Sequence, residues 1–182
     1  MEILSPRLVK DIQRLIGRMA MLNRFISRLA DKCFPFLKLL GNSTRLIWDD
    51  QCEKAFADLK AYLSSPPFLV NPELGEQLYL YLAALKKTFA IVLVKKMSKG
   101  QFPVYYVSKA LYDSKFNYSR IEKLAYSLLM ASRKLRQYFQ SHHIIVLTNQ
   151  PFREVLQKMT SSGWMVKWSI ELSEYSLKFQ LR

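Results

Sequence analysis

The side chains that could take part in chemistry are few and lie apart from one another. His142 and His143 are adjacent, not three or four residues apart, and have no acidic or cysteine partner nearby. Cys33 and Cys52 are too few for a disulfide framework or a zinc site, so we expect reduced thiols in an intracellular protein, in cytoplasm or nucleus. The five glycines form no phosphate-binding loop. No cofactor or metal is therefore expected.

The charge of the chain is more informative. There are 28 basic and 14 acidic residues, a net charge of +14. From residue 86 to the end the only acids are Asp113, Glu122, Glu154, Glu171 and Glu174. A surface this basic attracts polyanions, of which nucleic acid is the commonest inside cells. The alternative is a protein that is simply basic.

Basic residues of the second half alternate with aromatic ones. The candidate phosphate ligands are Lys109, Lys115, Arg120, Arg133 and Arg136. The aromatic residues among them are Tyr105, Tyr106, Phe116, Tyr118, Tyr138 and Phe139. The combination is typical of a surface that stacks on bases and neutralises phosphates. It is equally compatible with an aromatic core that has a basic rim.

Residues 1–63 have the apolar spacing of helices. Ser5-Pro6 predicts a helix start with Ser5 as the N-cap. The other expected features are a short helix over 22–29, a turn near Pro35, and a helix that opens at Asp49 or Asp50. Prolines and Gly75 then predict a linker over 64–77.

Beyond the linker the apolar period changes from helical to extended. Three β-rich runs with short connections predict an antiparallel meander, and a long helix should follow, then a strand that pairs beside the first. The ranges are 78–82, 89–94, 102–107, the helix 121–139 and the strand 144–147. A helix from Pro151, another over 166–172 and an extended piece over 176–181 complete an α+β plan.

Several motifs make the chain recognisable. Residues 78–93, 104–111, 118–139 and 146–151 resemble the RNase H-like domain of gypsy-type LTR retrotransposon Pol polyproteins. Their detailed sequence most resembles that of plant elements. Residues 1–63 resemble the end of the reverse transcriptase, a thumb or connection segment. The resemblance implies an RNase H-like mixed sheet with flanking helices over 78–182, truncated at its C-terminus.

RNase H cleavage uses two divalent ions held by carboxylates. In an alignment to the family without gaps, three of the family's carboxylate positions fall on Ala83, Leu124 and Asn149. A fourth would lie past Arg182. On this pattern we expect a degenerate domain that is not an enzyme.

The leading hypothesis is thus a catalytically inactive connection module that contacts RNA–DNA hybrid, with the rest of the Pol polyprotein as partner and no membrane. One alternative is an active ribonuclease H with a displaced metal site. Another is a cellular module that binds nucleic acid.

Overall fold

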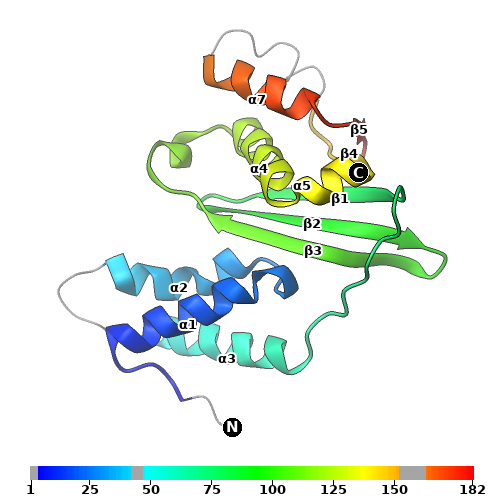
Figure 1. Cartoon of the computed structure of the whole chain (residues 1–182). Coiled ribbons are helices and arrows are strands. Elements are labelled where there is room, and N and C mark those ends of the chain that lie inside the picture. Colours follow the sequence, from blue (N-terminus) through cyan, green and yellow to red (C-terminus); the bar gives the residue numbers. More distant parts are fainter. Residues whose placement is uncertain (1–3, 42–46, 152–162) are drawn as a thin grey trace.

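The computed structural model describes residues 4–41, 47–151 and 163–182 (Figure 1). Four elements form the front segment: α1 (Val9–Met21), the 3₁₀ helix η1 (Asn23–Phe25), α2 (Leu29–Gly41) and α3 (Asp50–Ser64). The elements that follow are β1 (Gln77–Ala84), β2 (Thr88–Met97), β3 (Gly100–Ala110), η2 (Asp113–Asn117), α4 (Arg120–Lys134), α5 (Arg136–Ser141), β4 (His143–Leu147), α7 (Gly163–Ser173) and β5 (Leu177–Gln180). The helix predicted from Pro151 falls on 152–162, outside the described residues.

The five strands form one mixed sheet in the order β3-β2-β1-β4-β5. β1, β2 and β3 make the predicted antiparallel meander, and Gly100 takes a φ of 131°, open mainly to glycine, where β3 begins. β4 pairs in parallel with β1, and β5 in parallel with β4. The predicted α+β class, a helical segment followed by a mixed sheet with flanking helices, is confirmed.

Alternation along β1 separates the two faces of the sheet. Leu78, Leu80 and Leu82 are buried, because their face lies against the apolar stripe of α4. Leu128 of that stripe is fully buried. The long helix predicted over 121–139 is two helices, since α4 ends at Lys134 and α5 begins at Arg136.

The front segment has a buried cluster of its own, centred on Ile12, Phe36 and Phe56. Asp49 caps α3 by accepting a hydrogen bond from the Cys52 N–H at 2.8 Å, as the acids there predicted. The division of the chain into 1–63, 64–77 and 78–182 stays a prediction.

Three expectations for the front segment are wrong. Ser5 does not cap α1, which begins at Val9; its hydroxyl donates to Glu53 Oε1 instead. The helix over 22–29 is replaced by η1 and the start of α2. Pro35 lies inside α2, where it removes one backbone hydrogen bond.

The reason α2 continues through Pro35 lies in its buried face. Leu29, Cys33 and Phe36 are spaced by four and three residues on both sides of the proline, and all are buried. Burying an apolar side chain of the size of leucine or phenylalanine stabilises the fold by roughly 1.5–3 kcal/mol. Two such side chains offset the proline's cost of about 3 kcal/mol.

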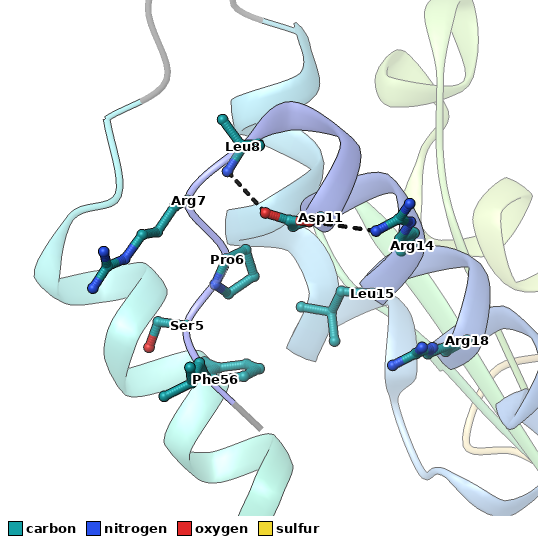
Figure 2. A pocket seen from close by; sticks show the side chains of 10 residues that line it. Ser5, Pro6, Arg7, Leu8, Asp11, Arg14, Leu15, Arg18 and Phe56 are labelled. Carbon is teal, nitrogen blue, oxygen red and sulfur yellow. Dashed lines mark hydrogen bonds and ion pairs between the residues drawn. The ribbon is translucent and has the colours of Figure 1, made fainter. Parts of the chain in front are cut away.

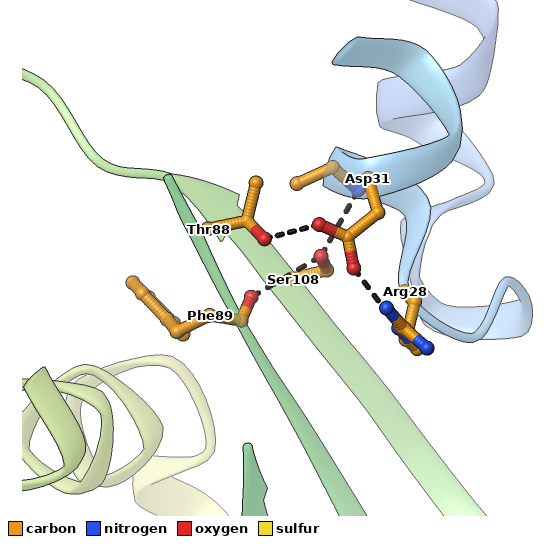
Figure 3. Close-up of polar contacts among 6 residues, drawn as sticks. Arg28, Asp31, Thr88, Phe89 and Ser108 are labelled. Carbon is orange, nitrogen blue, oxygen red and sulfur yellow. Dashed lines mark hydrogen bonds and ion pairs between the residues drawn. The ribbon is translucent and has the colours of Figure 1, made fainter. Parts of the chain in front are cut away.

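A polar network joins α2 to the sheet (Figure 3). Asp31 accepts hydrogen bonds from Thr88 Oγ1 and, at 2.9 Å, from Arg28 Nε. The Ala30 N–H donates to Ser108 Oγ at 2.9 Å, and that hydroxyl donates to the Phe89 carbonyl at 3.2 Å. The front segment is therefore fastened to β2 and β3.

Of the described helices, none has the length and apolar character needed to cross a bilayer.

Candidate nucleic-acid interface

Two of the three aligned carboxylate positions lie at one end of the sheet. Ala83 is exposed near the end of β1 and pairs with Ala90. Tyr81 lies opposite Leu147 in the parallel β1–β4 pair, so the same register brings Ala83 beside Asn149. The Asn149 Oδ1 accepts the Arg182 N–H at 3.1 Å. Assigning the family's carboxylate positions to these residues stays a prediction.

Leu124, the third position, is 7% exposed and packs in the core on the apolar face of α4. Neither its side chain nor that of Ala83 has an oxygen. Within residues 4–41, 47–151 and 163–182 there is no group of three or more His, Cys, Asp or Glu side chains that could hold a metal ion. The donor set in these ranges does not fit a pair of divalent ions, which need several oxygen ligands.

Three of the five predicted phosphate ligands follow one another where β3 leads through η2 into α4. Lys109 is exposed near the end of β3, and Arg120 is the exposed first residue of α4. Between them, Lys115 Nζ lies 5.7 Å from the ring centroid of Tyr126. Arg136 begins α5, beyond the far end of α4 from Arg120, and α4 is 15 residues or about 22 Å long. The five residues therefore do not form one cluster.

Arg133 is engaged in a bidentate ion pair. Its Nε and Nη2 donate to the two carboxylate oxygens of Glu171, each at 2.7 Å. The hydrogen bonds from Arg133 hold the pKa of Glu171 below its usual value, and those to Glu171 raise the pKa of the guanidinium. Because Glu171 lies on α7, the pair fastens α7 to α4.

Four of the six predicted stacking aromatics pack against other aromatic rings. Tyr105 meets Tyr138 edge to face, and Tyr118 lies against Tyr126. Phe139 is buried. These contacts favour the aromatic core over the stacking surface for this set of side chains.

One basic groove was not anticipated from the sequence. A cavity of about 740 Å³ lies between α1 and α3, and Arg7, Arg14 and Arg18 line it (Figure 2). Arg14 is 3.8 Å from Asp11. The spacing of four residues between Arg14 and Arg18, which sets both side chains on one side of α1, was the signal that could have revealed it.

The fold is that of known reverse transcriptases. The foamy viral protease-reverse transcriptase dRH in complex with double-stranded DNA superposes with a TM-score of 0.82 at 20% identity, covering 100% of this chain and 33% of that chain. The same viral protein in complex with RNA/DNA hybrid gives 0.81 at 20% identity, with 100% and 26% covered. The sheet and its flanking helices therefore define an RNase H-like fold of the reverse-transcriptase type.

Sequence relatives agree with the fold. The chain is 26% identical over 172 residues to the retrovirus-related Pol polyprotein from transposon 412 of Drosophila melanogaster, covering 94% of this chain and 14% of the relative. It is 26% identical over 175 residues to that from transposon 297 of the same organism, covering 95% and 16%. Residues 48–146 match the RNase H-like domain found in reverse transcriptase. The chain belongs to this family, and it spans less than a fifth of those Pol polyproteins.

The family overturns one expectation. The chain was expected not to be an enzyme, whereas the RNase H-like domains of Pol polyproteins point to a hydrolase. That expectation rested on the residue types at three positions of an ungapped alignment. The family match rests on a pattern that extends from Trp48 to Val146. The residue types at three positions do not outweigh that match in deciding whether the chain belongs to a class of enzymes.

Proposed function

We propose that this chain is a connection module of a Pol polyprotein that holds RNA–DNA hybrid on its basic surface. The observation that carries the proposal is electrostatic: the five strands contain no Asp or Glu in a chain of net charge +14. The foamy viral relative of the same fold is described in complex with RNA/DNA hybrid. The assignment to a degenerate plant element of the gypsy type also stays a prediction.

The proposed phosphate ligands are Lys109, Lys115, Arg120 and Arg136. For Lys109, Arg120 and Arg136, no ion pair joins them to another side chain within the described parts of the chain. Their charge is therefore available to phosphates. Arg133 already has a carboxylate partner, Glu171. If Arg133 paired with a phosphate instead, the ion pair between α4 and α7 would be lost.

The test is the binding of a fluorescently labelled RNA–DNA hybrid, followed by anisotropy over a range of salt concentrations. Each phosphate contact contributes about 0.9 to the slope of log K against log salt for a duplex. The variant Lys109→Gln/Arg120→Gln/Arg136→Gln should therefore lower the slope by up to about 2.7. Arg133→Gln is the matched control and should leave the slope almost unchanged. No binding at low salt, or equal slopes in all three proteins, would refute the proposal.

The family supports a second candidate, hydrolysis of the RNA strand of the hybrid. The same labelled hybrid, incubated with protein and Mg²⁺ or Mn²⁺, tests it directly. Cleavage that a chelator abolishes would establish a ribonuclease. The ligands would then have to include residues beyond Ala83, Leu124 and Asn149, whose side chains carry no carboxylate.

A further inference from the structure

The helices that the structure describes cover one face of the sheet only in part. Helices α4, α5 and α7 lie on one side, and the front segment lies on the other, beneath β3 (Figure 1). On that second side α2 contacts β2 and β3, and η1 contacts β3. The part of this face that the described helices leave open carries Tyr79 and Tyr81 of β1, Lys96 of β2, Lys178 of β5 and Arg182 after it, and we name it the tyrosine face.

Two tyrosines form its centre. Tyr79 and Tyr81 are half-buried residues of β1, and the period of two places their rings on the same side, about 7 Å apart along the strand. The Tyr81 hydroxyl donates to Gln101 Oε1 at 2.7 Å, which fixes the orientation of the ring. Two aromatic rings at this spacing form a platform for planar ligands.

Each tyrosine ring has a cation over one face, which a stacking base would displace toward its own phosphate. Lys96 Nζ is 4.5 Å from the ring centroid of Tyr79, and Arg182 Cζ is 5.3 Å from that of Tyr81. Lys178 is exposed on β5. Because the strands contain no Asp or Glu, no strand carboxylate competes for these cations.

A small cavity extends the platform toward the front segment. It has a volume of about 200 Å³, and Arg28, Tyr81, Ala83, Tyr106 and Arg182 are among its lining residues. That is room for roughly six or seven waters. Arg182 places positive charge in its wall, whereas the charge of Arg28 is paired with Asp31, so it suits an anionic group that lies on the Arg182 side.

We propose that the tyrosine face binds single-stranded nucleic acid. Bases stack on Tyr79 and Tyr81, and phosphates pair with Lys96, Lys178 and Arg182. Stacking on aromatic side chains requires unstacked bases, which a duplex does not offer. A second copy of the chain would bring like charge to this face, whereas a polyanion complements it.

The proposed site is separate from the ligands proposed for hybrid. Lys109 is opposite Phe89 in the β2–β3 register, and Phe89 is buried in the cluster beneath α4. Lys109 therefore lies on the other side of the sheet. Binding of a single strand and binding of hybrid can then be lost independently.

The experiment uses the full chain and labelled oligo(dT) and oligo(U) of about twelve nucleotides, with anisotropy as the readout. Tyr79→Leu/Tyr81→Leu should weaken binding at least about fivefold, since stacking contributes that much per base. Tyr81→Phe keeps the ring and loses only the hydrogen bond to Gln101, so it should bind more tightly than Tyr79→Leu/Tyr81→Leu. The DNA and RNA arms show which polymer is preferred, and binding of either supports the proposal.

Charge is tested by two matched variants. Lys178→Gln/Arg182→Gln should lower the salt slope by about 1.4, or about 0.7 for each phosphate contact on a single strand. Lys134→Gln/Lys167→Gln removes the same charge on α4 and α7, on the other side of the sheet, and should leave the slope unchanged. Both pairs of side chains are exposed, so the two variants should have equal thermal unfolding midpoints. The charge variants therefore test the proposal even if Tyr79→Leu/Tyr81→Leu does not fold.

Three results would overturn the proposal. The first is no binding of either oligonucleotide at low salt. The second is equal losses in the two charge variants, which would mean unspecific attraction. The third is a dimer, seen by light scattering, that Tyr79→Leu/Tyr81→Leu converts to monomer while the affinity for oligonucleotide stays the same. The tyrosine face would then bind a second copy of the chain.

Discussion

Replacing Asp31 by alanine should loosen the front segment from the sheet. The carboxylate accepts hydrogen bonds from the Thr88 hydroxyl and from Arg28 Nε. Thr88 is 2% exposed, so its hydroxyl would be left buried without this acceptor, at a cost of about 1–3 kcal/mol. The ion pair adds little, because the side chain of Arg28 is 57% exposed and such pairs contribute at most about 1 kcal/mol.

We therefore expect Asp31→Ala to lower the free energy of unfolding by about 2 kcal/mol. For a chain of this length that corresponds to a fall in Tm of roughly 4–8 °C. Urea unfolding followed by tryptophan fluorescence gives the free energy, because Trp48 stacks on Phe36 in the front segment. Circular dichroism over the same urea series reports the whole chain.

Two matched variants isolate the cause. Asp31→Asn keeps an oxygen acceptor for Thr88 and loses only the charge beside Arg28, so its effect should be below about 1 kcal/mol. Asp58→Ala removes an exposed carboxylate from α3 and should change stability by no more than about 0.5 kcal/mol. If Asp31→Ala is no less stable than Asp58→Ala, the account of this contact is refuted.

Three further outcomes follow from the described contacts. Leu128→Ala removes a fully buried side chain and should cost about 2–5 kcal/mol in urea unfolding; a loss below 1 kcal/mol would contradict its place in the core. The pKa of Glu171 lies below 4.5 in the folded chain, so its stabilising effect is full above about pH 4.5 and is lost as the pH falls further. Glu171→Gln should flatten the fall of Tm with pH below about pH 4.5, and an unchanged fall of Tm in acid would argue against the ion pair. Burial raises the pKa of the Cys33 and Cys52 thiols to about 11, so Ellman's reagent should label them at neutral pH only as fast as the chain unfolds. Fast labelling of the native protein would contradict that.

The strands were predictable because their signal is local. Residues 78–82 alternate leucine and tyrosine, and the neighbouring runs are β-branched and aromatic, so the meander and the parallel return of β4 follow from pattern and connection length. The helical half was harder. Pro35 is a strong local signal for a turn, but burial of Leu29 and Phe36 overrides it, and such tertiary effects are invisible in a window of sequence.

The candidate site shows the same division. Exposed Lys109 and Arg120 could be predicted from charge and from their position after a strand. Arg133 could not be set apart from them, because its carboxylate partner Glu171 is 38 residues away. Pairing across the fold decides which cations are available to a ligand, and only the structure supplies it.

The exposure of Tyr79 and Tyr81 has a geometric origin. Alternation in β1 predicts two faces but not which one is covered. The leucine face is buried by α4, while the contacts of α2 on the other face are anchored at Thr88 and Ser108, on the two strands farthest from β5. A helix about 10 Å wide covers roughly two strands, which lie about 4.8 Å apart. Among the described helices none covers the remaining three strands on that face, so the position of one polar anchor determines where the tyrosine face lies.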